Sequence, residues 1–181
     1  NPPALAAIKA VRARWPDLPQ YAAFDTAFHA TNSEVATAYA LPAEIRAQGI
    51  RRYGFHGLNY AAIVRIVKEF WLYPQANRLL VFHLGNGASA CAILDGTSIA
   101  TSMGYSPVDG LTMGTRTGQI DGNAVLRMAA DHGIDGAARI LNRESGLLGL
   151  GGVSDMRALH AAGTLDAQFA VDHFCYWAVR H

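Results

Sequence analysis

The sequence predicts an α/β fold. Three short apolar segments (79–84, 88–94 and 97–102) read as consecutive strands, and segments with helical spacing of apolar residues stand on both sides of them. The chain has 181 residues, the length of about one domain, with 51% hydrophobic and 16% charged residues, which allows a packed core. A net charge of +1 gives no electrostatic reason to expect nucleic acid or a membrane surface as a partner. No apolar run approaches the ~20 residues of a membrane-spanning helix.

The segment before the strands is predicted to be mainly helical. It opens with Asn-Pro-Pro, in which Asn suits a helix cap and Pro the first turn, and this predicts a helix over 1–15 that ends at Trp-Pro. The short aromatic run 20–28 predicts a buried strand that places Asp25 at its end. A short helix is expected within 42–49, and a longer one over 57–71.

From the strands onward, the turn chemistry sets the boundaries. Asp95-Gly96 is typical of a tight hairpin between the last two strands. Residues 103–118 contain four glycines and one proline and are expected to be irregular. Ser154 and Thr164 are expected N-caps for the last two helices. The predicted helices of this part are 122–132, 135–142, 154–162 and 164–180.

A glycine turn joins the first two strands. The strand that ends at His83-Leu84 runs into Gly85-Asn86-Gly87, and a second strand follows. Such glycines let backbone N–H groups approach a ligand and cradle a phosphate. The turn lacks the third glycine and the helix of a dinucleotide fingerprint, and it lacks the Gly-Lys-Ser/Thr of a P-loop.

Five blocks of the chain, in order, resemble those of the acetate kinase family. They are 24–29 (FDTAFH), 53–57 (YGFHG), the glycine turn, 113–118 (MGTRTG) and 145–150 (SGLLGL). The resemblance implies part of a duplicated, actin-like (ribonuclease H-like) fold, in which a mixed sheet is flanked by helices. Residues 1–75 would be the end of the first half with connecting helices, and 76–181 an incomplete second half.

The resemblance also implies an activity. It is the transfer of the γ-phosphoryl group of ATP to acetate, or another short carboxylate, by direct in-line attack, giving an acyl phosphate and ADP. Mg²⁺ would be the cofactor, and the protein would be a cytoplasmic homodimer. Acetate and propionate stay open, because one methylene in an apolar pocket changes binding by only ~1–3 kcal/mol.

Three residues are candidates for the transfer step. From the residues alone, Asp25 is read first as a turn or helix cap, and His56, between glycines, is equally a structural or a catalytic residue. The resemblance assigns Asp25 to the acidic group at the transfer centre and His56 to stabilisation of the transferring group. Arg116 carries a permanent, forked charge that suits phosphoryl oxygens, while the alternative is a loop-bracing ion pair with Asp109 or Asp121.

The remaining site residues are assigned by the resemblance. Two of them, Phe55 and Pro107, would form walls of the acyl pocket, although Phe55 can equally be plain core. The residues expected to bind the nucleotide are His83, Leu84, Gly85, Asn86, Gly87, Asp155, Met156 and Arg157. Without the resemblance, the last three are only a capped helix start.

One departure from the family lies beside His56. The block after it usually continues Thr-Ser-His, whereas this chain has Leu58-Asn59-Tyr60, which changes the side chains near the acyl site. The other histidines show no metal-ligand spacing, so no metal ligand is assigned in the chain. Both cysteines, Cys91 and Cys175, are expected to be buried thiols of a reduced protein.

A second interpretation is a non-catalytic fragment with residual nucleotide binding or a partner-association role. Family members are about twice as long, and the motifs expected on both sides are missing. The chain alone is therefore expected to be inactive or nearly so, with apolar surface exposed where the missing parts would pack.

Overall fold

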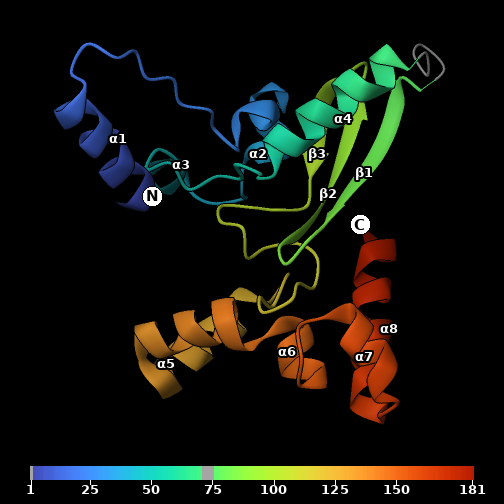
Figure 1. The fold of residues 1–181 in the computed structure, drawn as a ribbon. Helices are drawn as coiled ribbons and strands as arrows, with labels where there is room; N and C mark the ends of the chain where they lie inside the picture. Colours follow the sequence, from blue (N-terminus) through green and yellow to red (C-terminus); the bar gives the residue numbers. More distant parts are fainter. Residues whose placement is uncertain (1, 71–75) are drawn as a thin grey trace.

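We describe the structure from a computed structural model, which covers residues 2–70 and 76–181 (Figure 1). The predicted Asn1 cap and the predicted helix end at Trp71 lie outside these residues. The sheet is formed by β1 (Arg78–Leu84), β2 (Ala88–Leu94) and β3 (Thr97–Thr101). The helices are α1 (Pro2–Arg14), α2 (Glu34–Thr37), α3 (Ala43–Arg46), α4 (Gly57–Glu69), α5 (Gly122–Arg139), α6 (Gly146–Gly151), α7 (Met156–Ala162) and α8 (Leu165–Arg180), with a 3₁₀ turn at Ala27–Thr31 and a π-helical turn at Ile140–Glu144.

The three predicted strands form one antiparallel sheet in the order β1-β2-β3. Asp95 and Gly96 have φ angles of 51° and 83°, so both central residues of the β2–β3 turn are left-handed, as a tight hairpin requires. In the β1–β2 ladder His83 lies opposite Ser89. Any parallel strand of the expected mixed sheet would have to come from outside the described residues.

Helix α4 covers one face of the sheet (Figure 1). Its Tyr60 and Val64 pack against Cys91 and Ile93 of β2, and together these four residues form a buried cluster. This packing brings the first residues of α4 to the end of the sheet that carries the glycine turn.

The prediction that residues 103–118 are irregular is confirmed, and parts of this segment are buried. Met103, Leu111 and Met113 have no exposed surface and form a cluster with Ala88 of β2. The loop therefore has a core of its own, which fixes the backbone around Arg116.

Below the loop, α6, α7 and α8 form a third buried cluster, made of Leu147, Leu159, Ala167, Ala170 and Val171. Thr164 caps α8 as predicted, but the side chain that caps α7 is Asp155 and not Ser154. The break predicted between the helices 122–132 and 135–142 is confirmed, because α5 consists of two helical segments that meet at a kink at Gly133, whose φ is 72°. Helix α6 was not predicted.

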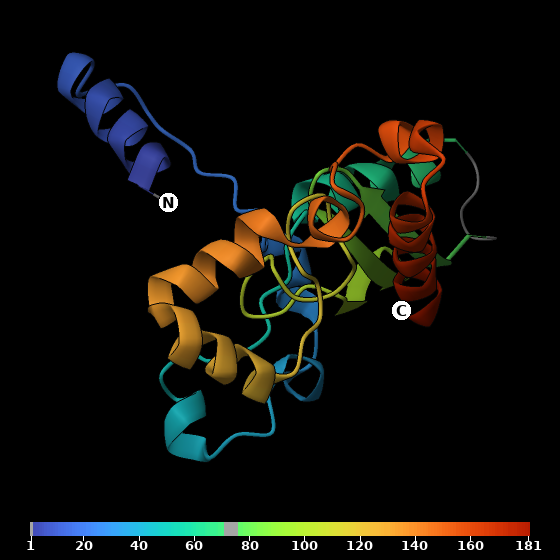
Figure 2. The same cartoon turned by 90° about the horizontal axis from the view of Figure 1, so that it is seen from below.

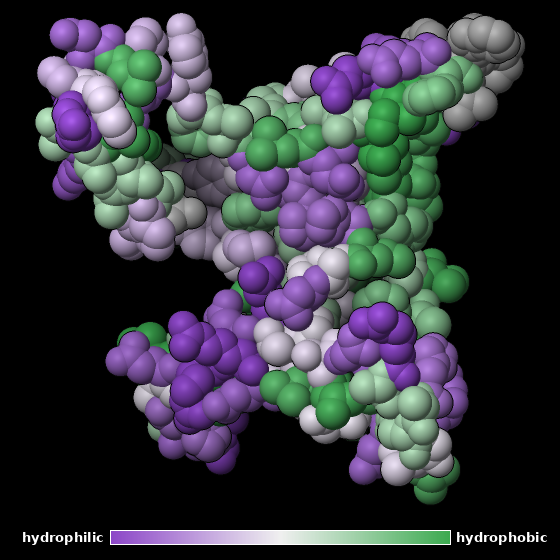
Figure 3. Space-filling model, in the orientation of Figure 1, coloured by the Kyte–Doolittle hydropathy of each residue, from purple (hydrophilic) through white to green (hydrophobic). Residues whose placement is uncertain are grey.

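The strand predicted over 20–28 is wrong. Residues 20–24 form no regular secondary structure and pair with no strand of the described chain, and the side chains of Tyr21 and Phe24 are 94% and 66% exposed. Helix α1 has no buried residue, and Figure 2 shows it standing apart at the end of this segment. Apolar side chains of β1, Leu80 and Leu84, are also exposed, and Figure 3 shows hydrophobic surface along this strand.

The two cysteines differ. Cys91 is buried as predicted, but Cys175 is exposed on α8, so the prediction for Cys175 is wrong. None of the helices in the described part of the chain has the length and apolar character to cross a membrane.

Candidate active site

Asp25 anchors the start of α4. Its Oδ2 accepts the backbone N–H of His56 at 2.7 Å, and its carbonyl oxygen accepts the N–H of Gly57 at 2.8 Å. A Cβ at position 57 would collide with this carbonyl, so the close approach requires glycine. Asp25 thus caps a helix, as its residue type suggests, and lies beside His56, as the resemblance implies. Its Oδ1 receives no hydrogen bond from the described residues.

His56 is held in an uncommon conformation. Its φ of 61° is left-handed, which few residues other than glycine adopt, and it directly precedes α4. The ring stacks on His83 with 3.9 Å between centroids, and Nδ1 lies 2.8 Å from Ser89 Oγ. Burial, followed by the neighbouring His83, lowers the pKa of His56, although Asp25 acts in the opposite direction. The ring is therefore held neutral at neutral pH.

A second histidine supports this conformation. The buried His29 donates from Nε2 to the carbonyl oxygen of Phe55 at 2.9 Å, so its Nδ1 must accept from Ser98 Oγ, also at 2.9 Å. Burial lowers the pKa of His29 and keeps it neutral. The sequence analysis assigned His29 no functional role. Its signal was its place at the end of the FDTAFH block.

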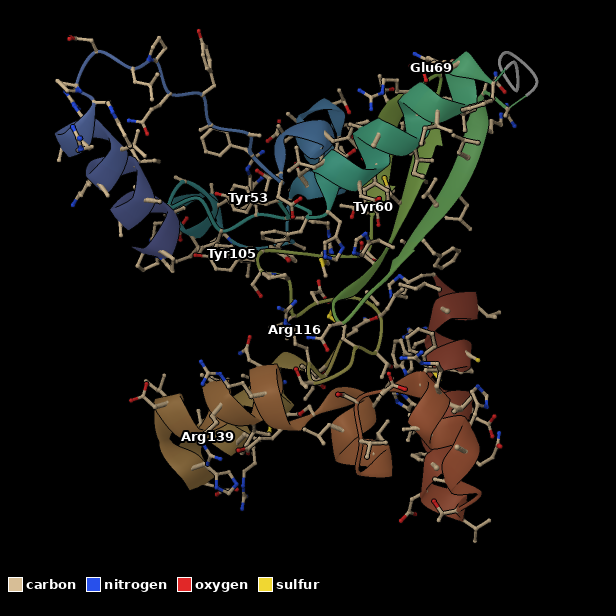
Figure 4. All side chains as sticks on the ribbon, in the orientation of Figure 1. Tyr53, Tyr60, Glu69, Tyr105, Arg116 and Arg139 are labelled. Carbon is tan, nitrogen blue, oxygen red and sulfur yellow. The ribbon has the colours of Figure 1, made fainter. Side chains whose placement is uncertain are left out.

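Arg116 reaches the same place from the irregular loop (Figure 4). Its Nη1 donates to the carbonyl of Pro107 at 3.3 Å. Neither carboxylate considered as an ion-pair partner contacts it, because Asp109 pairs with Arg52 at 3.1 Å and Asp121 caps α5. The alternative interpretation, in which Arg116 braces the loop through an ion pair with Asp109 or Asp121, is therefore wrong. The charge of Arg116 is not neutralised by either carboxylate.

Gly87 is the point on which these groups converge. A Cβ built on it would lie 3.2 Å from Arg116 Nη1 and 3.4 Å from His56 Nε2. A guanidinium and an imidazole edge therefore face the same small space beside the glycine turn, with Asp25 behind the imidazole. Such a space suits an anionic group.

The elements around this space are tied together through their backbones. The N–H of Gly114 donates to the carbonyl of Asn86 at 3.0 Å, and the N–H of Leu148 donates to the carbonyl of Gly114 at 2.9 Å. The glycine turn, the Arg116 loop and α6 are thus joined by consecutive hydrogen bonds.

A cavity of about 450 Å³ lies on the other side of the glycine turn. Five of the residues expected to bind the nucleotide line it: Leu84, Gly85, Asn86, Asp155 and Met156. The other three do not, since His83 and Gly87 lie at His56, and the Arg157 side chain is 95% exposed, 3.4 Å from Asp155. The N–H of Ala158, followed by Arg157, lowers the pKa of Asp155 and keeps it charged.

The two expected walls of an acyl pocket lie near the centre. Phe55 precedes His56 and packs against the Met103 cluster, while Pro107 contacts Arg116 through its carbonyl. Both roles stay predictions, as do those of the catalytic residues. Within residues 2–70 and 76–181, no group of three or more His, Cys, Asp or Glu side chains could hold a metal ion.

A neutral imidazole and a guanidinium without a carboxylate partner among the described residues thus lie beside a glycine turn and a cavity. The chain belongs to the acetokinase family, whose model matches residues 1–181. This confirms the resemblance found in the sequence.

Relatives and solved structures agree with this placement. The chain is 50% identical to an acetate kinase of Methylocella silvestris over 95% of its length and 43% of the relative's, and 43% identical to that of Protochlamydia amoebophila over 97% and 45%. It superposes on a propionate kinase from Francisella tularensis with a TM-score of 0.90 at 38% identity, covering 97% of this chain and 47% of that one. For the Porphyromonas gingivalis acetate kinase the TM-score is 0.88 at 35% identity, covering 98% and 46%. The chain thus spans less than half the length of these proteins, and its fold matches a part of theirs.

Proposed function

We propose that the described site transfers the γ-phosphoryl group of ATP to acetate or another short carboxylate. The convergence of Arg116 Nη1 and His56 Nε2 on Gly87, beside the 450 Å³ cavity, carries this proposal. A carboxylate oxygen would attack the γ-phosphorus, the bond to the β-phosphate oxygen would break, and acyl phosphate and ADP would form. No covalent group of the chain is needed, so positioning and charge stabilisation do the catalysis.

Each part of the site has a task in this scheme. The cavity lined by Leu84–Asn86 and by Asp155 and Met156 would hold the nucleotide, with the glycine turn at its phosphates. Arg116 and His56 would contact the oxygens of the γ-phosphoryl group during its transfer. Phe55 and Pro107 would bound the acceptor's short apolar tail, and the proteins to which this chain is similar include both acetate kinases and a propionate kinase.

Asp25 fits a role beside Mg²⁺ carried by the nucleotide. Magnesium in such sites is bound through one or two carboxylates together with substrate phosphates, so a cluster of protein ligands is not required. The Oδ1 of Asp25 has no hydrogen bond from the described residues, while Oδ2 is fixed by the His56 N–H. The ion would supply neutralisation of phosphate charge.

A second candidate is nucleotide binding without transfer. The observation that favours it is the exposure of α1 and of the segment 15–24, where the apolar Trp15, Leu18, Tyr21 and Phe24 are all open to solvent. Such surface is typical of a face that packs against further polypeptide. Completion of the site would then depend on that polypeptide.

The test incubates the purified chain with ATP, Mg²⁺ and acetate or propionate, and traps acyl phosphate with hydroxylamine. If the site transfers, Arg116→Ala lowers product by about 10³-fold or more, since an arginine at a phosphoryl transition state contributes on that order. Arg127→Ala is the matched control, because Arg127 is an exposed residue of α5 paired with Asp131. It should leave the rate unchanged.

ATP binding, measured by calorimetry on the same samples, separates the two candidates. Product that depends on Arg116 supports transfer. ATP binding without product supports the non-catalytic candidate for this chain. A folded chain with neither would overturn both.

A further inference from the structure

Tyr60 is the last of the three residues, 58–60, at which this chain departs from the usual Thr-Ser-His of its family, and it lies one turn into α4. It is completely buried and points from α4 toward the sheet (Figure 4). Its hydroxyl forms a short hydrogen bond with Ser89 Oγ, and the same Ser89 Oγ lies 2.8 Å from His56 Nδ1. Three residues from α4, β2 and the turn before α4 thus form one chain of hydrogen bonds.

Counting protons fixes the direction of this chain. Burial raises the pKa of Tyr60 to about 12, so its hydroxyl keeps its proton, and this proton needs a hydrogen-bond acceptor. Ser89 Oγ is then the one acceptor that the described residues offer to Tyr60. Since a buried hydroxyl without an acceptor is disfavoured, Tyr60 donates to Ser89.

The direction of the Tyr60–Ser89 hydrogen bond determines which ring nitrogen of His56 carries the proton. Ser89 has a single hydroxyl proton, and with its oxygen accepting from Tyr60 it directs that proton to His56 Nδ1. Nδ1 must therefore be the unprotonated nitrogen. A neutral imidazole with an unprotonated Nδ1 carries its proton on Nε2.

We propose that Tyr60 is a positioning residue which, through Ser89, holds His56 in the Nε2–H tautomer, so that His56 presents a hydrogen-bond donor to the phosphoryl oxygens beside Gly87. The role at the phosphoryl group rests on the proposed function. The relay itself rests only on the hydrogen bonds of this chain. His56 would then act as a neutral donor and would take up no proton from the acceptor carboxylate.

The surroundings of His56 agree with this state. Nε2 is the ring atom turned to Gly87, at 3.4 Å from a Cβ built there. Three positively charged or ionisable groups near the ring, His83, Arg116 and His29, disfavour a second proton on His56. Asp25 favours one. The Asp25 carboxylate accepts the backbone N–H of His56 and does not contact Nδ1. The tautomer of the His56 ring is therefore set by Ser89 and not by Asp25.

The tautomer can be measured without turnover. Long-range ¹H–¹⁵N correlation spectra of the ¹⁵N-histidine-labelled chain at pH 7.5 distinguish protonated from unprotonated ring nitrogens, and the His56 signals are assigned by their loss in His56→Gln. The expected spectrum of the wild type shows Nε2 protonated and Nδ1 not. In Tyr60→Phe, which keeps the ring but removes the donor, Nδ1 should shift toward the protonated position as both tautomers become populated.

Two further variants sharpen the result. Ser89→Ala should have the same effect on Nδ1. Tyr53→Phe is the matched control, because the Tyr53 hydroxyl donates to the carbonyl of Gly49 at 2.9 Å and takes no part in the relay, so the His56 signals should not move.

A wild-type His56 protonated on Nδ1, or a Tyr60→Phe spectrum equal to that of the wild type, would overturn the relay. If Tyr60→Phe does not fold, the wild-type spectrum and Ser89→Ala still decide. Inorganic phosphate added to the wild type should shift the Nε2–H signal. Signals unmoved by saturating phosphate would overturn the donor role, a failure of the proposed phosphoryl site and not of the relay.

Discussion

The proposed transfer centre and the proposed nucleotide side of the site are built in different ways. At the centre, Asp25, His56 and Ser89 are fixed by hydrogen bonds from backbone or buried side chains, and Ser89 has no exposed surface. On the nucleotide side, the Asp155 and Arg157 side chains are 54% and 95% exposed and bond only to each other and to the N-terminus of α7. The proposed centre is therefore preorganised by the chain itself, whereas the proposed nucleotide side offers exposed groups that would gain a partner if a nucleotide binds there.

The difference between the two sides has an energetic consequence. A group fixed by burial affects stability and chemistry together, because its partners lose hydrogen bonds when it is removed. An exposed group affects binding with a smaller effect on stability, although Asp155 also caps α7, and loss of that cap costs about 1 kcal/mol. Substitutions on the two sides should therefore separate by which quantity they change.

The largest effect on stability is expected from Gly57→Ala at the centre. The added methyl would collide with the carbonyl of Asp25 and lie 3.0 Å from Phe28 Cβ, so the start of α4 must move away from Asp25. We expect a loss of about 1–3 kcal/mol in the free energy of unfolding, the usual cost of overpacking. Urea unfolding followed by tryptophan fluorescence measures it.

Gly122→Ala provides the control for this prediction. Gly122 is likewise the first residue of a helix, α5, but nothing lies within 4 Å of a Cβ built there. Alanine is a better helix former than glycine, so we expect no loss, or a gain of up to about 1 kcal/mol. Equal losses in the two variants would contradict the close approach of Asp25 to α4.

The sequence allowed much of the fold to be predicted where local chemistry decides it. The hairpin at Asp95-Gly96 depends on a backbone conformation that these two residues favour, and the Thr164 cap depends on one side chain and one N–H. The strand over 20–28 failed because an apolar, aromatic run does not show whether a ladder partner exists. Here the segment pairs with no strand of the described chain, and Tyr21 and Phe24 remain exposed.

The site could be predicted only in part for the same reason. The blocks containing Asp25, His56 and Arg116 were visible in the sequence, and the structure brings these residues together. The supporting contacts join residues that are distant in sequence, such as His29 with Ser98 and His56 with Ser89. No local pattern specifies such pairs. They follow from how α4 and the 3₁₀ turn pack on the sheet.

The buried histidines of the centre predict how stability depends on pH. Burial lowers the pKa of both His29 and His56 below 6.5 in the folded state, so the unfolded chain binds more protons just below that pH. Their contribution is fully present above pH 6.5 and is lost as the pH falls from 6.5 through the lowered folded values. The free energy of unfolding, measured in urea, should therefore fall between pH 7.5 and 5.5.

Two variants assign this slope to the centre. His29→Gln should reduce the loss of stability on acidification, even if it lowers stability at both pH values. His160→Gln, at an exposed histidine of α7, should leave the pH dependence as in the wild type. A slope that is the same in all three proteins would show that His29 does not titrate as its burial requires.

The smallest effect is expected on the nucleotide side. Asp155→Ala removes a carboxylate that lines the cavity, and because charged hydrogen bonds to a ligand would be lost, ATP affinity should fall roughly tenfold. Ser154→Ala is the matched control, since Ser154 also lines the cavity but does not cap α7. Calorimetric titration with ATP compares the two, and urea unfolding checks that each variant stays folded. Equal ATP affinities for Asp155→Ala and the wild type would remove Asp155 from the proposed nucleotide site. The remaining nucleotide contacts would then come from the glycine turn, whose backbone belongs to both sides of the site, and the contrast between the two sides would lose its clearest example.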